Sequence, residues 1–190
     1  MYELFVTVGS TSFPLLIDAV LDETLQQMLV GAGYTHLTVQ TGSTGSCTVH
    51  KSVDELKNQI SRNGLVVTTF AYKDSIHEDI SRAHVVLAHG GAATILEALD
   101  QNKPLIVCAN PQLMDNHQQE LCDALAVHLT CTTVDALGTA LVAAKSRVMP
   151  VILPANDIIV PRVLDSLLNV QCSFHCGSSQ LYFNTQFFDL

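Results

Sequence analysis

The chain has 190 residues, of which 48% are hydrophobic and only 14% are charged, and its formal net charge is −9 at pH 7. This length fits one domain with a buried core. The acidic balance argues against nucleic acid or an anionic membrane as the main partner, because both repel a negative surface. A large buried sheet, or a partner that covers part of the surface, would explain the scarcity of charges.

The N-terminal residues and the cysteines indicate a cytoplasmic protein. The first residues lack the basic region and long apolar core of a signal peptide, and no apolar run is long enough to cross a bilayer. Six cysteines are scattered through the chain, which favours reduced thiols over a disulfide framework. Cys172, His175 and Cys176 lie close in sequence, but no second ligand pair accompanies them at zinc spacing, so we expect no metal site.

The hydrophobic pattern predicts strands that alternate with helices along the chain. We expect strands at residues 4–8, 36–40, 65–70, 85–88, 105–109 and 128–132. We expect helices at residues 14–30, 53–60, 92–100, 134–144 and 161–168, with further helices opening at Ser75 and within residues 110–120. Such alternation predicts a Rossmann-like α/β fold, a parallel sheet of five to seven strands with helices on both faces.

A loop of small residues follows the first strand. Gly9, Ser10, Thr11 and Ser12 precede Pro14, which suits the first turn of a helix, with Ser12 as its cap. The main-chain amides and hydroxyl groups of this loop would suit an anion. An ordinary turn between strand and helix explains the same residues equally well.

The most informative stretch runs from Val85 to Glu97. An apolar strand leads through His89, Gly90, Gly91, Ala92 and Ala93 into a helix that carries Thr94 and Glu97. Small residues let a ligand approach the main chain, and the amides and dipole of a helix N-terminus favour a phosphate. Glu97 would then accept hydrogen bonds from a ribose diol. Alternatively, Thr94-x-x-Glu97 is only a capping box.

A cluster of polar side chains follows the strand at residues 105–109. It includes Asn110, Asp115, Asn116, His117 and Gln118. Amide and imidazole groups at one junction suit the hydroxyl groups of a sugar better than a charge. A well-capped, solvated first turn of a helix is the simpler alternative.

Four segments together resemble a known family. They are residues 5–13, Tyr72-Lys73-Asp74-Ser75, His89-Gly90-Gly91-Ala92-Ala93-Thr94 with Glu97, and residues 113–121. In this order they are similar to the donor-binding subunits of the N-acetylglucosaminyltransferase that adds the second sugar to dolichol-linked N-acetylglucosamine. They resemble, more distantly, the nucleotide-sugar half of the bacterial peptidoglycan N-acetylglucosaminyltransferases. The resemblance covers about residues 2–170, whereas residues 171–190 form a tail outside it.

This resemblance implies the C-terminal half of a GT-B glycosyltransferase, with UDP-GlcNAc as donor and no resident cofactor or metal. It further implies a membrane-anchored partner subunit that holds a lipid-linked sugar acceptor at the cytosolic face of the endoplasmic reticulum. The residues that the resemblance implies at the donor site are Gly9, Ser10, Thr11, Gly90, Gly91, Ala92, Ala93, Thr94, Glu97, Asn116, His117 and Gln118.

Catalysis is harder to place within this chain. His89 adjoins the phosphate-binding segment and is our candidate catalytic residue, although a buried histidine that supports the turn fits equally well. The base for the acceptor hydroxyl is expected on the partner. The family more often reads His-Ala-Gly-Ala-Gly where this chain has His89, Gly90, Gly91, Ala92 and Ala93. A non-catalytic subunit that retains the fold, and an unrelated nucleotide-binding protein, stay open as alternatives.

Overall fold

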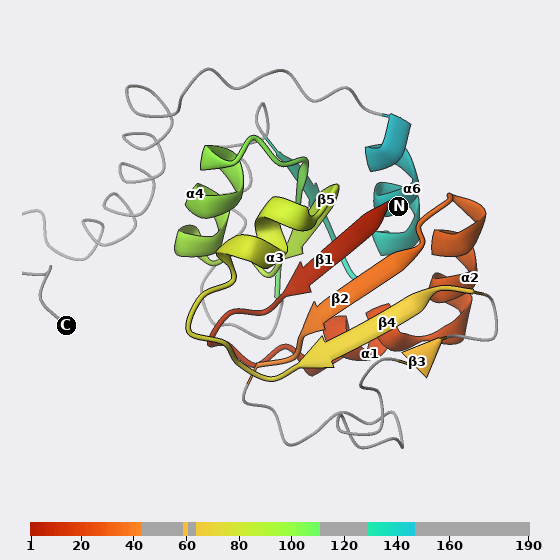
Figure 1. The fold of residues 1–190 in the computed structure, drawn as a ribbon, viewed down its shortest axis with the longest axis horizontal. Coiled ribbons are helices and arrows are strands. Elements are labelled where there is room, and N and C mark those ends of the chain that lie inside the picture. The colour runs from red at the N-terminus through yellow and green to blue at the C-terminus, as the bar shows by residue number, and fades with distance from the viewer. Residues whose placement is uncertain (43–58, 61–63, 111–128, 147–190) are drawn as a thin grey trace, which may run out of the picture.

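The computed structural model describes residues 1–42, 59–60, 64–110 and 129–146. Its centre is a seven-stranded sheet with the strand order β3-β4-β2-β1-β5-β6-β7 (Figure 1). The strands are β1 (Glu3–Thr7), β2 (His36–Gln40), β3 (Gln59–Ile60), β4 (Val66–Phe70), β5 (Val85–Ala88), β6 (Leu105–Cys108) and β7 (Thr130–Thr132). All pairings are parallel except β3 with β4. The predicted α/β fold is therefore confirmed.

The strand order reverses direction at β1, so the topological switch point of the sheet lies beside this strand. From β1 the chain runs outward through β2 to β4, then returns to form β5 on the other side of β1 and continues to β6 and β7. Thr7 is aligned with Gln40 on one neighbour and with Ala88 on the other. The carboxyl ends of β1, β2 and β5 therefore share one edge, where open α/β sheets bind ligands.

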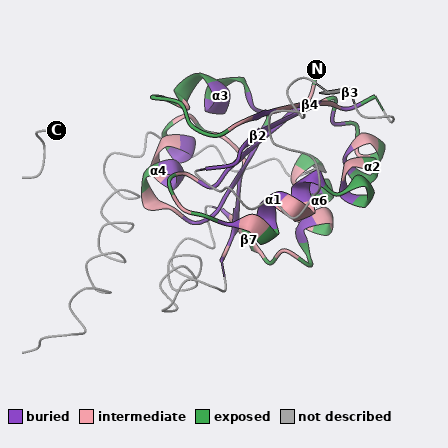
Figure 2. Ribbon diagram, turned by 90° about the horizontal axis from the view of Figure 1, so that it is seen from below, coloured by how far each residue is buried: buried purple, intermediate pink, exposed green. Residues whose placement is uncertain are grey.

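Helices pack on both faces of the sheet. Helices α1 (Pro14–Leu21), α2 (Glu23–Gly31) and α6 (Leu137–Ser146) lie on one side, and α3 (His77–Arg82) and α4 (Ala92–Asp100) on the other (Figures 1 and 2). Successive side chains of β1 point to opposite faces of the sheet. Leu4 and Val6 therefore belong to the core under the first group of helices, and Phe5 belongs to the core under the second. All three side chains are fully buried, so β1 is the central element of the fold.

The helix predicted at residues 14–30 is two helices in the structure. The chain leaves helical geometry at Asp22, whose φ is −65° and ψ is 138°. Its carboxylate accepts a hydrogen bond from the Thr24 amide at 2.8 Å and so caps α2. Ser12 does not cap α1 as predicted, because Phe13 is the N-cap residue and no side chain bonds to the first turn. Hydrophobic periodicity missed this break because the buried residues of both helices belong to one core.

Two other helix boundaries differ from the prediction. Gln59 and Ile60 form strand β3 instead of the end of a helix, because they pair with Val67 and Val66 of β4. The remaining residues of that predicted helix lie outside the described residues. Helix α3 begins at His77, and Ser75 accepts a hydrogen bond from the His77 amide at 3.2 Å. The predicted capping box at Ser75 is therefore absent, although its hydroxyl still bonds to one amide at the helix start.

Lysine side chains bind the carboxyl ends of two helices. Lys103 donates to the carbonyl groups of Ser81 and Ala83 at the end of α3. Lys145 of α6 donates to the Ala32 carbonyl at the end of α2. The last carbonyl groups of a helix have no hydrogen-bond partner within the helix. Cations at these positions bond to them and interact favourably with the negative end of the helix dipole. They also tie α3 and α2 to segments that follow much later in the sequence.

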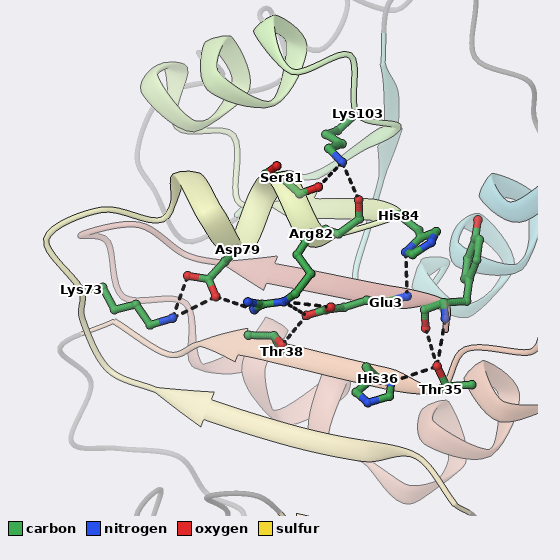
Figure 3. A network of polar contacts seen from close by, with 12 residues as sticks. Glu3, Thr35, His36, Thr38, Lys73, Asp79, Ser81, Arg82, His84 and Lys103 are labelled. Atoms are coloured by element: carbon green, nitrogen blue, oxygen red, sulfur yellow. Dashed lines mark hydrogen bonds and ion pairs between the residues drawn. The ribbon is translucent and has the colours of Figure 1, made fainter.

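Arg82 joins two buried carboxylates above the sheet. Its guanidinium lies 3.1 Å from Glu3 of β1 and 2.8 Å from Asp79 of α3 (Figure 3). The carboxylate of Asp79 also contacts Lys73, and that of Glu3 accepts a bond from Thr38. Burial lowers the pKa of Arg82, but the carboxylates of Glu3 and Asp79 outweigh this and raise it overall. The network anchors α3 to β1 and β2.

The cysteines differ from one another in the structure. Cys108 is buried and free, and burial raises the pKa of its thiol to about 12. Cys131 lies exposed on edge strand β7 and is disulfide-bonded. The prediction of reduced thiols is therefore wrong for Cys131. Composition alone does not distinguish a cysteine that is buried in the core from one that lies on the surface. Cys172, His175 and Cys176 lie outside the described residues, as does the proposed tail at residues 171–190.

Candidate functional site

The segments that follow β1 and β5 meet at the switch in winding direction. Gly9 follows β1, and His89, Gly90 and Gly91 follow β5 and lead into α4. Gly9 has a φ of +58° and Gly90 a φ of +96°, conformations that side-chain-bearing residues rarely adopt. These glycines let two tight turns form side by side at the edge where the sheet would meet a ligand.

His89 fills the space between the two turns. Its side chain is 6% exposed. A Cβ built on Gly9 would lie 2.9 Å from its Cε1 atom, and one built on Gly91 would lie 2.7 Å from the same atom. Both glycines are therefore needed for the ring to fit. The structure places three of the predicted site residues in direct contact, from two segments about eighty residues apart in sequence.

The environment of His89 keeps its imidazole neutral. Burial lowers its pKa, and a hydrogen bond with the Thr7 backbone opposes this only in part. Its Nδ1 atom is buried and has no hydrogen-bond partner within the described part of the chain. A buried polar atom without a partner costs free energy, and such atoms are enriched where a protein binds something. His89 therefore has a free polar atom beside the start of α4.

The N-terminus of α4 is open to hydrogen-bond acceptors. Gly91 is the N-cap residue, and no side chain caps the first turn. The first internal bond of the helix is from the Ile95 amide to the Gly91 carbonyl at 3.1 Å, so the amides of Ala92, Ala93 and Thr94 precede the helical ladder. The alternative of a capping box is wrong, because Thr94 lies inside the helix and is buried.

Ala93 replaces a glycine of the usual family pattern without consequence for the backbone. It lies within the first turn of α4 and is exposed, where alanine is a good helix former. Gly90, which replaces the usual alanine, instead has the positive φ described above. The glycine needed by this version of the turn therefore stands one residue before Gly91.

Side chains on both sides hold the loop after β1. The Gly9 amide donates to Thr7 Oγ1 at 3.1 Å, and Gln40 Nε2 donates to the Gly9 carbonyl at 3.4 Å. On the other side, Asn110 at the end of β6 donates to the Ser12 carbonyl at 3.4 Å. Asn110 and Gln40 are buried, whereas Ser10 is exposed and Thr11 is partly exposed. The loop thus has a fixed base and an accessible tip.

Glu97 lies further along α4 and contacts α3. Its Oε1 atom is 3.4 Å from Nδ1 of His77, and its side chain is 34% exposed. Gln101 Nε2 also lies 3.1 Å from that His77 nitrogen. Five residues along a helix correspond to a rise of about 7.5 Å, which is the axial separation of Glu97 from Ala92. The carboxylate therefore remains accessible, about one and a half turns beyond Ala92 and less than one turn beyond Thr94.

The remaining predicted donor-site residues, Asn116, His117 and Gln118, lie outside the described residues. Within the described ranges, no cluster of three or more His, Cys, Asp or Glu side chains is arranged to hold a metal ion. In the same ranges no helix has the length and apolar character needed to cross a membrane. The sequence reasoning missed Thr7 and Gln40, whose only signal was the presence of polar residues at the ends of buried strands.

Residues 3–145 match the family model described as Glycosyltransferase family 28 C-terminal domain. The chain belongs to this family. Its match spans every described element except the last residue of α6. Membership confirms the predicted equivalence to the C-terminal half of a GT-B glycosyltransferase. The proposed division at residue 170 stays a prediction.

Curated relatives carry one name, UDP-N-acetylglucosamine transferase subunit ALG13. The Mus musculus protein is 38% identical over 125 residues, which are 66% of this chain and 10% of that protein. The Homo sapiens protein is 37% identical over 142 residues, or 72% of this chain and 12% of that protein. The Saccharomyces cerevisiae protein is 33% identical over 143 residues, or 63% of this chain and 71% of that protein.

The chain therefore spans only about a tenth of the length of the mammalian relatives. A solution NMR structure of ALG13 has the same fold, with a TM-score of 0.65 and 26% sequence identity. That similarity covers 88% of this chain and 97% of the NMR chain. The family fold is thus shared over nearly the whole length of that structure.

Proposed function

We propose that this chain is the donor-binding subunit of an N-acetylglucosaminyltransferase that uses UDP-GlcNAc. The observation that carries the proposal is the uncapped N-terminus of α4 beside the Gly9 turn, at the point where the sheet changes winding direction. The names of the relatives, which are UDP-N-acetylglucosamine transferase subunits, support the choice of donor.

The amides of Ala92, Ala93 and Thr94 bind the diphosphate in this proposal. When the glycosidic bond breaks, negative charge gathers on the departing UDP. Fixed N–H dipoles and the positive end of α4 stabilise that charge without having to reorganise. The helix is nine residues long, enough to carry a dipole to its N-terminus.

Side chains complete the donor site. Glu97 accepts hydrogen bonds from the ribose hydroxyl groups, for which it must keep at least one oxygen free of His77. The neutral ring of His89 packs against Gly91 and supports the turn that presents the first amides of α4. Ser10 and Thr11 lie at the accessible tip of the loop and face the same ligand. Asn116, His117 and Gln118 contact the sugar in this proposal.

The acceptor half of the reaction belongs to a partner. In our proposal a membrane-anchored subunit binds dolichol-diphosphate-GlcNAc, supplies the base for its hydroxyl group and brings this chain to the cytosolic face of the endoplasmic reticulum. The word subunit in the names of the relatives supports a partner. The reaction would be the second sugar transfer of the lipid-linked precursor for protein N-glycosylation.

Donor binding is tested by calorimetric titration of the chain with UDP-GlcNAc, UDP-glucose and UDP. We expect UDP-GlcNAc and UDP to bind and UDP-glucose to bind more weakly than UDP-GlcNAc. A ligand at a hundred times its Kd should also stabilise the fold by about 2.7 kcal/mol. Absence of binding by any uridine nucleotide would refute the proposed donor site.

Activity is tested after co-expression with a membrane-anchored acceptor subunit. We expect labelled N-acetylglucosamine to pass from UDP-GlcNAc to the lipid-linked acceptor only when both chains are present. A variant with Glu97→Ala in this chain should transfer more slowly than the wild type when UDP-GlcNAc is below its Kd, while still associating with membranes. If that variant transfers at the wild-type rate, this chain is a non-catalytic subunit that only retains the fold.

A further inference from the structure

Two polar side chains are buried at the ends of neighbouring central strands. Thr7 ends β1 and is 0% exposed, and Gln40 ends β2 and is 2% exposed. The two residues are aligned in the register of β1 and β2. Burying a hydroxyl and an amide costs free energy unless each is hydrogen-bonded. The hydrogen-bond partners of Thr7 and Gln40 therefore indicate the role of the two side chains.

The pair holds both polar groups of the Gly9 main chain. The Gly9 amide donates to Thr7 Oγ1 at 3.1 Å, and the Gly9 carbonyl accepts from Gln40 Nε2 at 3.4 Å. The Thr7 hydroxyl donates in turn to Gln40 Oε1. Two hydrogen bonds thus fix Gly9, and the third joins the two side chains that make them. The φ of Gly9, +58°, is strained for any residue except glycine.

Gly9 in turn limits where His89 can lie. A Cβ on Gly9 would meet Cε1 of His89 at 2.9 Å, and the same ring atom lies 2.7 Å from a Cβ built on Gly91. Contacts therefore run without a gap from Gln40 and Thr7 through Gly9 and His89 to the N-cap residue of α4. A shift of Gly9 opens the space that now confines the imidazole.

We propose that Thr7 and Gln40 are positioning residues for the donor site. They fix the Gly9 turn so that the His89 ring stays against Gly91, the N-cap residue of α4. The proposal rests on the proposed function in one respect, that the first amides of α4 bind the donor diphosphate. Neither side chain needs to touch the donor, because each acts through the backbone of Gly9.

The experiment compares Thr7→Val with Thr7→Ser. Valine keeps the shape of threonine but removes the hydroxyl that bonds to Gly9 and Gln40, whereas serine keeps it. Thr38→Val is the matched control, since Thr38 lies on the same face of β2 as Gln40 and its hydroxyl bonds instead to Glu3 at 2.8 Å. Thr7→Val loses its bonds to Gly9 and Gln40, and Thr38→Val loses its bond to Glu3, so both variants remove a buried hydroxyl from the same sheet.

Two readouts separate positioning from general loss of stability. Calorimetry gives the Kd for UDP-GlcNAc, and we expect it to rise about tenfold in Thr7→Val and to stay within about twofold in Thr7→Ser and Thr38→Val. Histidine NMR follows the ring of His89 without any donor. We expect its resonances to change in Thr7→Val and to match the wild type in Thr38→Val.

Equal effects of Thr7→Val and Thr38→Val on both readouts would overturn the proposal, because both residues would then act only through stability. Unchanged His89 resonances in Thr7→Val would also overturn it. If the wild type binds no donor while Thr7→Val still alters His89, the proposed function fails and the positioning of His89 stands. Gln40→Leu, with the melting temperature as a check of folding, gives the second test of the same contacts.

Discussion

Glu97 Oε1 lies 3.4 Å from His77 Nδ1, and this contact joins α4 to the first turn of α3. The carboxylate that we propose as the ribose ligand is therefore already oriented by a neighbouring helix. Because both side chains are partly exposed, the contact contributes little to stability. Its main effect is to fix the direction of Glu97 before the donor binds.

Replacing Glu97 by alanine should weaken UDP-GlcNAc binding by about ten- to a hundredfold, since a hydrogen bond to a charged group contributes about 1.5–3 kcal/mol. His77→Ala is the control, because it removes the contact with α3 and leaves the carboxylate. Titration calorimetry of both variants checks the prediction. If both lose affinity equally, the contact with His77 and not the ribose is what matters.

Adding one methyl group to Gly91 should displace His89. The new Cβ of Gly91→Ala would lie 2.7 Å from Cε1 and 2.9 Å from Nε2 of the ring. We expect a loss of about 2 kcal/mol in the free energy of unfolding, together with weaker donor binding. Urea denaturation and calorimetry measure the two effects.

Gly31→Ala is the matched substitution for Gly91→Ala. Gly31 ends α2, and a Cβ there would meet nothing within 4 Å. Alanine at this site should stabilise the protein by up to about 1 kcal/mol and leave donor affinity unchanged. If Gly31→Ala lost as much stability as Gly91→Ala, the cost at Gly91 would not be assignable to contact with His89.

The stability of the protein should depend on pH through His89. Burial lowers its pKa in the folded state, so the unfolded chain binds the proton more readily. The contribution of the neutral ring is complete above the ordinary histidine pKa of about 6.5 and is lost as the pH falls from there towards the folded value. His89→Gln should reduce this slope, by at most about 1.4 kcal/mol per pH unit. Urea denaturation of both proteins between pH 5 and pH 8 measures the difference.

Removing the guanidinium of Arg82 should leave two buried carboxylates without their shared partner. The side chains of Glu3 and Asp79 are each 3% exposed, whereas that of Arg82 is 51% exposed. We therefore expect Arg82→Met to cost about 2 kcal/mol, less than a fully buried pair would. Lys73→Met, which removes a second contact to Asp79, should cost less than about 1 kcal/mol. Thermal unfolding ranks the two variants, and equal losses would contradict this account of Arg82.

The parts of the fold that depend on local sequence were predictable. Runs such as Val85–Ala88 are apolar on both faces, as a buried parallel strand requires, and glycines mark the turns that follow. The contact between Gly9, His89 and Gly91 was not predictable residue by residue. It depends on β1 and β5 being neighbours, which is a property of the strand order and not of either segment.

Other features were missed because local patterns do not distinguish their causes. Asp22 interrupts a helical pattern that continues on both sides, and only its backbone geometry reveals the break. Thr7 and Gln40 look like ordinary polar ends of strands. Their role depends on the backbone of Gly9, which the chain brings to Gln40 only through the pairing of β1 with β2.

The basic side chains of the described residues have a consequence for how an anion approaches. All four of them, Lys73, Arg82, Lys103 and Lys145, bond to carboxylates or carbonyl groups of the chain itself. With a net charge of −9, the isolated chain repels a nucleotide diphosphate at long range, and within the described residues the uncapped end of α4 attracts it at short range. Added salt should therefore accelerate association, since it screens the repulsion more than the short contacts with amides.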